Sequence, residues 1–242
     1  MTIGINETED VRKTITLVTG ANKGIGYETA RQLIDRGHTV YIGARDPERG
    51  KKAAAEIGCR FVHLDVTDDD VVAVALATID ADEGRLDVLI NNAGIGGSHR
   101  PTDELTGADA SLVFETNAVG VVRVTHAALP LLRKSSNPVV VNVSSALGSF
   151  WAVHNPEHPA SLHAAVLYGS SKAAVSMITA QYAKGVPEVK FNAVEPGYTA
   201  TDLTNGNGRP VEESGKMVAR MATIDADGPT GTFQQDCGVL PW

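Results

Sequence analysis

The sequence predicts an α/β fold, a single doubly wound parallel β-sheet of the Rossmann type flanked by helices on both faces. Short apolar runs rich in Val and Ile alternate with stretches of helical length, as parallel strands and their crossover helices do. A glycine-rich turn over residues 19–26 joins the first run to the first helical stretch. Three irregular stretches, residues 96–108, 148–164 and 205–210, are expected to surround a ligand site at the carboxyl ends of the strands.

The expected elements follow one another in strand-then-helix order. We expect strands over residues 15–18, 40–42, 61–64, 88–90, 139–143 and 189–194. We expect helices over residues 25–35, 48–57, 69–79, 112–132 and 165–184, with Asp68 or Asp69 as an N-cap. Residues 231–242 are expected to add the last strand, with Trp242 packing against the protein. The sequence therefore predicts one domain over residues 14–242, preceded by a polar extension, residues 1–13.

The composition is that of a globular chain. Apolar residues make up 43% of the 242 residues and charged residues 21%, which argues against disorder. The net charge of -8 argues against a nucleic-acid or anionic-membrane partner, because such partners require clustered Lys and Arg. The polar residues 1–13 resemble neither a signal peptide nor a membrane span, and no later stretch approaches the ~20 apolar residues that a membrane helix needs.

Cysteine usage indicates the compartment. Cys59 and Cys237 are too few for a disulfide framework or a cysteine zinc site. We expect both to be buried free thiols in a reducing compartment, the cytoplasm.

The glycine-rich turn predicts a dinucleotide site. Its sequence is Thr19-Gly20-Ala21-Asn22-Lys23-Gly24-Ile25-Gly26. Glycines at 20, 24 and 26 permit a tight turn, a close approach of backbone to a diphosphate, and an anion site at the helix N-terminus. The spacing differs from the usual GxGxxG, and a purely structural glycine turn is the alternative.

The end of the second strand predicts NADPH rather than NADH. Sites for NAD usually offer a carboxylate there, whereas this chain offers Gly43-Ala44-Arg45. An arginine suits the 2′-phosphate of NADPH, and Lys23 could add a second positive charge. The alternative is that both are solvated surface cations, with Asp46 partly neutralising Arg45.

A tyrosine and a lysine four residues apart, Tyr168 and Lys172, are expected on one face of a helix. A nearby cation favours the phenolate and so lowers the pKa of the tyrosine, which prepares it to exchange a proton with a substrate. Such pairs also arise by chance on surface helices, so the spacing alone does not decide the function.

Taken together, the motifs resemble the short-chain dehydrogenase/reductase family over residues 14–204. They are the glycine turn, Asn91-Asn92-Ala93-Gly94, Ser144-Ser145, and Tyr168 to Lys172, in that order. Asn22-Lys23-Gly24 paired with Ala44-Arg45-Asp46 looks most like the NADPH-dependent carbonyl reductase branch.

The resemblance implies roles for individual residues. Tyr168 matches the proton donor, and Lys172 matches the cation that lowers its pKa and binds the nicotinamide ribose. Ser145 matches the hydroxyl that polarises the substrate oxygen, and Asn117 the residue whose backbone helps to hold a relay water. From the residues alone, Ser144 and Ser145 could instead satisfy strand-end backbone groups, and Asn117 could be a helix-bending polar residue.

The resemblance also implies the cofactor contacts. Asp65 resembles the adenine contact, Asn91, Ala93 and Gly94 the contacts around the adenosine ribose, and Pro196-Gly197 with Thr201 the segment that holds the nicotinamide carboxamide. The full set of expected cofactor-binding residues is Gly20, Asn22, Lys23, Gly24, Ile25, Gly26, Arg45, Asp65, Val66, Asn91, Ala93, Gly94, Tyr168, Lys172, Pro196, Gly197, Thr199 and Thr201.

The chain departs from the family pattern between the serine and the tyrosine. Ser145 and Tyr168 are 168 − 145 = 23 positions apart, farther than is usual, and the excess lies in residues 150–159. This segment resembles a shortened form of the insertion of monomeric carbonyl reductases, which covers the face otherwise used for dimerisation. A monomer and a homodimer both stay open.

The inserted segment raises two further questions. His154, Glu157, His158 and His163 could suggest a metal site, but prolines and irregular spacing disfavour it, and no metal is expected. Phe150 and Trp151 either line the substrate pocket or anchor the loop.

We therefore expect an NADP(H)-dependent oxidoreductase that reduces a ketone, aldehyde or quinone, with hydride from nicotinamide and a proton from Tyr168. The alternatives are a 3-oxoacyl reductase or alcohol dehydrogenase of a biosynthetic pathway, or a non-catalytic NADPH-binding redox sensor. The expected partner is a small carbonyl compound.

Overall fold

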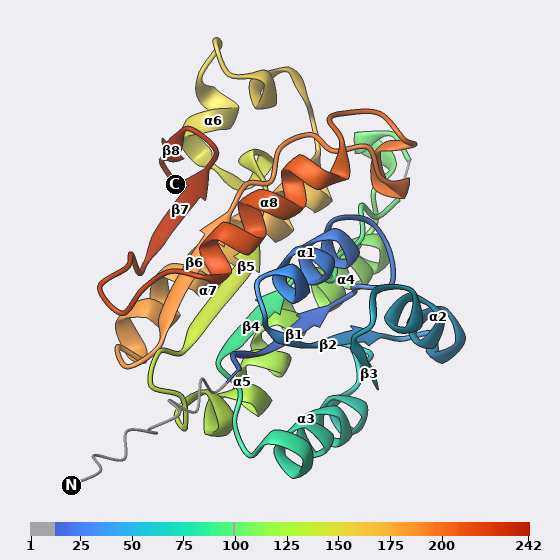
Figure 1. The fold of residues 1–242 in the computed structure, drawn as a ribbon. Coiled ribbons are helices and arrows are strands. Elements are labelled where there is room, and N and C mark those ends of the chain that lie inside the picture. Colours follow the sequence, from blue (N-terminus) through green and yellow to red (C-terminus); the bar gives the residue numbers. More distant parts are fainter. Residues whose placement is uncertain (1–12, 99) are drawn as a thin grey trace, which may run out of the picture.

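An eight-stranded sheet with the order β3-β2-β1-β4-β5-β6-β7-β8 forms the centre of the computed structural model, which describes residues 13–98 and 100–242 (Figure 1). The predicted extension, residues 1–13, lies outside the described residues except for Lys13. The strands are β1 (Ile15–Thr19), β2 (Thr39–Ala44), β3 (Arg60–His63), β4 (Val88–Asn91), β5 (Val139–Val143), β6 (Lys190–Val194), β7 (Thr232–Gln235) and β8 (Gly238–Val239).

The strand pairing confirms a mostly parallel sheet, with one correction. Strands β1 to β7 pair in parallel, but β8 pairs antiparallel to β7, with Gln234 opposite Val239. The carboxyl-terminal segment therefore adds two strands instead of one, because the chain turns back after Gln235 and a short turn can join antiparallel strands.

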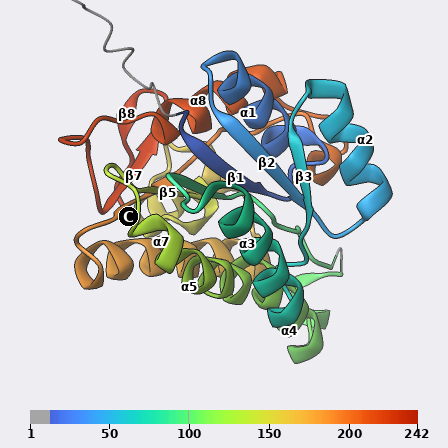
Figure 2. The same cartoon turned by 60° about the horizontal axis from the view of Figure 1, so that its bottom comes forward.

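Helices cover both faces of the sheet (Figure 2). They are α1 (Gly24–Asp35), α2 (Pro47–Ile57), α3 (Asp69–Glu83), α4 (Gly107–Phe114), α5 (Gly120–Leu132), α6 (Phe150–His154), α7 (Val166–Gly185) and α8 (Val211–Ala222). Short 3-10 turns are η1 (Thr102–Glu104), η3 (Ala146–Gly148), η4 (Pro159–Leu162) and η5 (Asp202–Thr204), and η2 (Glu115–Val119) is a π-helical turn.

Each face of the sheet has its own apolar core. On one side Leu76, Val124 and Phe191 belong to a cluster that packs α3 and α5 on the sheet. On the other side Leu33 and Met217 belong to a cluster that packs α1 and α8 on it. Burying one such side chain contributes roughly 1.5–3 kcal/mol, so the two clusters hold both helical layers in place.

Two helical expectations need correction. The stretch 112–132 was expected as one regular helix, but it begins at Gly107 and changes to π-helical geometry over Glu115–Val119. Helices α6 and α8 were not expected, although α8 has a strongly one-sided apolar pattern. Asp68 is the N-cap of α3, because its carboxylate accepts hydrogen bonds from the N–H groups of Asp70 and Val71.

The order of the strands places the ligand edge of the sheet. The chain moves outward from β1 to β3 and then returns to place β4 on the other side of β1. At such a switch point the loops after neighbouring strands diverge and leave room for a ligand. The glycine-rich turn after β1 and the Asn-Asn-Ala-Gly segment after β4 meet there.

The peripheral residues give mixed outcomes. Trp242 packs on Phe233 with ring centroids 5.4 Å apart, as predicted.

Both cysteines are free, but Cys237 is exposed, so the expectation that both are buried is wrong. Burial raises the pKa of the half-buried Cys59 thiol to about 11. In the described part of the chain no helix is long and apolar enough to cross a membrane.

Candidate active site

The glycine-rich turn is fastened to the end of β4. Gly20 has a φ of +62°, and a Cβ there would lie 2.8 Å from the Cα of Ala93, so only glycine fits. The Thr19 hydroxyl accepts hydrogen bonds from the N–H groups of Asn92 and Ala93, both at 3.0 Å. Asn92 Nδ2 in turn donates to the carbonyls of Thr19 and Gly20. The two motifs therefore form one surface, although they are more than seventy residues apart in sequence.

The N-terminus of α1 fits a bound diphosphate. Its N-cap residue, Lys23, makes no side-chain capping bond, and its first turn contains no acidic residue. The next two helices are capped internally by Asp46 and Asp68. The first N–H groups of α1 thus lack the carboxylate partner that α2 and α3 have, and the helix dipole favours an anion there. The diphosphate of a dinucleotide supplies such an anion.

Arg45 lies exposed directly after β2, as the prediction of a 2′-phosphate site requires. Asp46, the expected neutralising partner, accepts from the N–H groups of Glu48 and Arg49 and pairs with the Arg49 guanidinium at 3.2 Å. Within residues 13–98 and 100–242 Arg45 forms no ion pair. The exposed guanidinium can therefore meet a ligand or solvent, while its charge also acts on the Asp65 carboxyl.

Lys23 has a partner that the sequence did not suggest. Its Nζ pairs with the carboxylate of Asp202 on η5, 179 residues away, and both side chains are more than half exposed. The hydrogen bond and charge of Lys23 lower the pKa of Asp202, and Arg49 acts in the same direction. Arg49 is thus a third cation of this region. Its position four residues after Arg45, in the first turn of α2, was the signal that the sequence offered.

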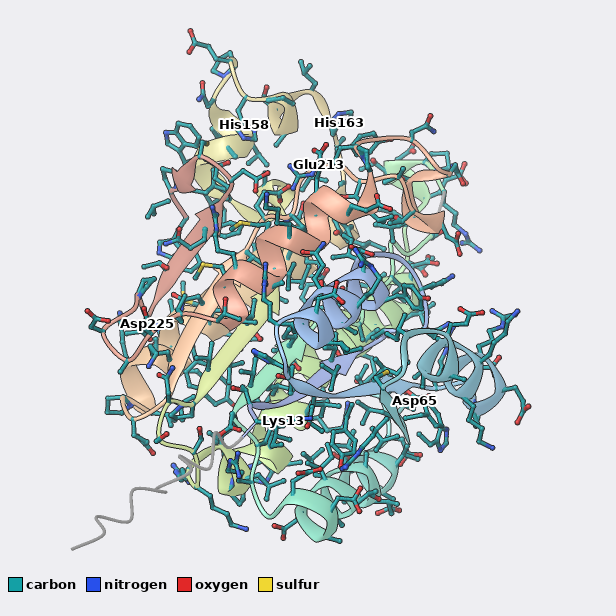
Figure 3. The ribbon with its side chains drawn as sticks, in the orientation of Figure 1. Lys13, Asp65, His158, His163, Glu213 and Asp225 are labelled. Atoms are coloured by element: carbon teal, nitrogen blue, oxygen red, sulfur yellow. The ribbon has the colours of Figure 1, made fainter. Side chains whose placement is uncertain are left out.

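Asp65 lies two residues after the end of β3, the outermost strand (Figure 3 labels it), and the charge of Arg45 acts on its carboxyl. Burial raises the pKa of its carboxyl, but hydrogen bonds from Thr67 and the charges of Arg45 and His63 outweigh burial and lower it. Its Oδ1 accepts from the N–H and hydroxyl of Thr67. The neighbouring Val66 carbonyl accepts from Arg123 Nη1 at 2.6 Å.

Two expected cofactor contacts have side chains that face the protein interior. Asn91 Nδ2 donates to Asn142 Oδ1 at 2.8 Å and to Thr125 Oγ1 at 3.2 Å. The buried Thr199 hydroxyl lies 2.6 Å from Ser214 Oγ and donates to the Gly197 carbonyl. Thr201 does reach the glycine-rich turn, where its Cγ2 lies 3.5 Å from the Cβ position of Gly24. Only the backbones of Asn91 and Thr199 are therefore left for a cofactor.

Two glycines bring the serine motif onto α7. A Cβ at Gly148 would lie 2.4 Å from the Lys172 carbonyl carbon, and one at Gly169 would lie 2.9 Å from the Leu147 carbonyl oxygen. The η3 turn that follows Ser145 therefore rests directly on the helix that carries Tyr168. Ser145 and Tyr168 can therefore lie close together despite the 23 positions between them in sequence, because the inserted residues extend away from this contact.

Lys172 is enclosed, with 4% of its surface exposed. Its Nζ donates to the Val143 carbonyl at 2.7 Å and lies 5.7 Å from the centre of the Tyr168 ring. Burial lowers the pKa of the Lys172 ammonium to about 8, and the nearby Glu195 carboxylate opposes that shift. Lys172 is therefore a cation that titrates close to neutral pH.

Asn117 joins the end of β4 to α7. Its Oδ1 accepts from the Ile95 N–H at 2.8 Å, and its Nδ2 donates to the Ile95 carbonyl and to Ser171 Oγ. It lies in the π-helical turn, so it also marks a change in helix geometry. The structure thus brings Asn117, Ser145, Tyr168 and Lys172 to one place.

The pKa of Tyr168 moves opposite to the expected direction. Burial raises it, the charge of Glu195 raises it further, and a hydrogen bond with Ser145 acts the other way. The expectation that the pKa of Tyr168 is lowered is wrong for the structure, because the loss of solvent outweighs the groups that stabilise the phenolate. Ser144 has a structural role: its buried hydroxyl donates to the Lys172 carbonyl at 3.1 Å.

The inserted segment is tied to the carboxyl terminus. Ser149 Oγ donates to the Pro241 carbonyl at 2.6 Å, and the Trp151 N–H donates to the Trp242 carbonyl at 3.2 Å. Trp151 packs edge-on against His158, which favours loop anchoring, while Phe150 is 70% exposed. Among the described residues no three His, Cys, Asp or Glu side chains are grouped to hold a metal ion.

Such a site is typical of dinucleotide-dependent oxidoreductases with a Rossmann-type sheet. Comparison with known proteins identifies the family. Residues 14–211 match the short chain dehydrogenase family, and the chain therefore belongs to the short-chain dehydrogenase/reductase family. The family binds a nicotinamide cofactor, so the protein is an oxidoreductase.

Proteins similar to this chain include reductases and dehydrogenases. Salutaridine reductase of Papaver bracteatum is 32% identical, over 93% of this chain and 94% of that protein. Cis-4-hydroxycyclohexanecarboxylate dehydrogenase of Sinomonas cyclohexanicum is 35% identical, over 85% of this chain and 80% of that protein. The structure of NADPH-bound carbonyl reductase from chicken fatty liver is similar with a TM-score of 0.83 and 29% identity, covering 96% of this chain and all of the other.

Proposed function

We propose that the protein is an NADPH-dependent reductase that converts a ketone, aldehyde or quinone carbonyl to the alcohol. The observation that carries this proposal is the grouping of Tyr168 with Ser145 and the buried Lys172 at the carboxyl edge of the sheet. A tyrosine whose pKa is raised stays protonated at neutral pH, which is the form that a proton donor in reduction requires.

Each residue has a defined task in this reaction. The bound cofactor would supply the hydride, and negative charge then develops on the substrate oxygen. The Ser145 hydroxyl donates a hydrogen bond to that oxygen, and Tyr168 transfers its phenolic proton to it. The Lys172 ammonium then stabilises the phenolate that remains. Asn117 keeps α7 and the end of β4 in register, so that these groups stay aligned.

The preference for NADPH is supported by three cations at the adenosine end. Arg45 is exposed after β2, Lys23 is the N-cap residue of α1, and Arg49 lies in the first turn of α2. A 2′-phosphate offers several acceptor oxygens to such a group, whereas the free hydroxyl of NADH offers no charge. The similar carbonyl reductase structure contains NADPH, which agrees with this assignment.

The test is to mix the purified protein with NADPH and a panel of ketones, aldehydes and quinones and to follow cofactor oxidation. Reduction of at least one carbonyl, with NADH a poorer cofactor, is the expected result. Tight NADPH binding without turnover of any carbonyl would favour the redox sensor instead.

A second candidate is an alcohol dehydrogenase working in the oxidative direction. It is favoured by the similarity to cis-4-hydroxycyclohexanecarboxylate dehydrogenase. Alcohol oxidation by NADP+ that exceeds carbonyl reduction at neutral pH would support it. A 3-oxoacyl substrate belongs in the same panel.

We propose the cytoplasm as the compartment of this reaction. The oligomeric state is a separate question, and sedimentation of the protein distinguishes a monomer from a homodimer.

A further inference from the structure

A carboxylate without a task in the reaction lies beside the catalytic group. Glu195 directly follows β6, and its N–H donates to the Gln234 carbonyl of the β7 strand at 2.8 Å. On the other side, the Ser144 N–H donates to the Val194 carbonyl at 2.8 Å. Glu195 is therefore held between the ends of β5 and β7, on the same edge as Ser145.

Both carboxylate oxygens of Glu195 accept backbone hydrogen bonds from functional segments. Oε2 accepts from the N–H of Ala146, the residue after Ser145. Oε1 accepts from the N–H of Gly197 at 2.9 Å, in the segment expected to hold the nicotinamide carboxamide. One side chain thus joins the serine turn to the cofactor segment, and a shorter or apolar side chain could not bridge both.

We propose that Glu195 is a positioning residue that joins the Ser145 turn to the Pro196-Gly197 segment and keeps a negative charge beside Tyr168 and Lys172. The charge holds the proton on both groups and so biases the site toward carbonyl reduction. This inference rests on the proposed function, because it assigns Glu195 a task in that reaction.

Charged groups face Glu195 from three neighbouring elements. Tyr168 and Lys172 approach from α7, and the carboxylate raises the pKa of each. His158 at the start of η4 and Arg209 before α8 act on Glu195 itself (Figure 3 labels His158). Burial raises the pKa of the Glu195 carboxyl, and its two backbone hydrogen bonds and the nearby Arg209 and His158 side chains reduce that rise without reversing it. The two hydrogen bonds and the Arg209 guanidinium stabilise the ionised form against the cost of burial.

Arg209 is itself held in place at this edge of the sheet. Its Nη1 pairs with Asp236 in the turn between β7 and β8, and its Nε donates to Ser214 Oγ at 3.1 Å. Within the described part of the chain its Nη2 is buried without a hydrogen-bond partner. Asp236 and Ser214 therefore leave one nitrogen of the guanidinium without a hydrogen-bond partner, and the positive charge of Arg209 lowers the pKa of the Glu195 carboxyl.

The proposal predicts the direction of a pH shift. Reduction needs Tyr168 as phenol and Lys172 as ammonium, and activity falls when either loses its proton. Because the Glu195 charge raises both pKa values, its removal lets both protons leave at lower pH. The alkaline limb of kcat/KM should then move to lower pH by about one unit.

The experiment compares Glu195→Gln, Glu195→Asp and a control, Glu188→Gln. Glutamine keeps the size of the side chain but removes the charge, whereas aspartate keeps the charge but shortens the bridge. Glu188 is an exposed carboxylate before β6 that pairs with Arg133 at 2.9 Å, so its loss tests a general charge effect. The pH dependence of kcat/KM for NADPH-driven carbonyl reduction is measured for each, and thermal unfolding reports folding.

In E195Q the alkaline limb is expected at lower pH. In E195D the limb is expected near its wild-type position, with a reduced kcat. In E188Q both the limb and kcat are expected to match the wild type. A limb in E195Q at the wild-type pH would overturn the proposal, as would an equal shift in E188Q. If E195Q does not fold, the limb of E195D decides: a position away from that of the wild type contradicts the role of the charge.

Failure of the proposed function would be separately visible. If the wild type reduces no carbonyl, the titration of the Tyr168 phenol is followed by ultraviolet difference spectra, each variant being compared with the same variant carrying Tyr168→Phe. A lower Tyr168 pKa in E195Q supports the role of Glu195, and an unchanged one refutes it.

Discussion

The two ends of the candidate site differ in how far their positive charges are exposed to solvent. At the adenosine end, Lys23 has 58% of its side chain exposed and shares an exposed ion pair with Asp202. At the catalytic end, Lys172 is enclosed and burial lowers its pKa to about 8. Solvent screens the first kind of charge and weakly screens the second. Substitutions at the catalytic end should therefore change rates strongly, and those at the adenosine end should change cofactor affinity modestly.

Removing the proton donor is the strongest way to test this comparison. Tyr168→Phe should lower kcat for carbonyl reduction by about 10²- to 10⁴-fold, because general acid catalysis contributes that much. NADPH binding, measured by fluorescence titration, should change little. A Tyr168→Phe variant with wild-type turnover would show that another group donates the proton.

The low pKa of Lys172 predicts an alkaline limit for activity. The folded-state pKa is lowered to about 8, so the ammonium is present below that pH and is lost as the pH rises through it. Carbonyl reduction should fall by about tenfold per pH unit above this limit. Stopped assays across alkaline pH measure this effect.

The Lys172→Arg variant serves as the control. A guanidinium stays protonated across this pH range, so the variant should lose the alkaline limb even if its kcat is lower. A limb that persists unchanged in Lys172→Arg would assign the titration to another group.

The adenosine end should respond through cofactor choice. Arg45→Ala should weaken NADPH binding about tenfold, equivalent to ~1.4 kcal/mol, with a smaller effect on NADH. Calorimetric titration with both cofactors measures the ratio. Lys52→Ala, an exposed cation farther along α2, is the matched control. Equal losses for both cofactors would contradict a 2′-phosphate contact.

The smallest effect concerns the partner of Lys23. In the structure Asp202 pairs with the Lys23 ammonium, the group that is expected to meet the 2′-phosphate. Asp202→Asn should therefore tighten NADPH binding about two- to fivefold, since an exposed ion pair contributes up to ~1 kcal/mol. NADH binding should not change. Weaker NADPH binding in this variant would mean that Asp202 helps to hold the cofactor instead of competing with it.

The sequence predicted the fold and the family because both depend on local patterns. Alternating apolar runs located β5 at residues 139–143 without error. Glycines in the first turn and the order of the motifs identified the family. The C-terminal hairpin and the π-helical turn were missed, because one depends on a short reversal and the other on contacts of Asn117 across the fold.

The orientation of polar side chains could not be predicted in the same way. Asn91 belongs to the motif that was expected to meet the cofactor, yet its amide faces Asn142 and Thr125. No sequence motif singled out Glu195, although it bridges Ala146 and Gly197. Both outcomes depend on partners that are distant along the chain.

The sequence by itself determined the alternation of strands and helices, the glycine-rich turn and the identity of the residues that can transfer a proton. Only the tertiary structure decided their environments. It placed Lys23 next to Asp202, pressed η3 onto α7, and enclosed Tyr168 and Lys172 next to Glu195. The physical reason is that a local pattern specifies backbone geometry, whereas burial and pKa depend on residues brought together from the whole chain.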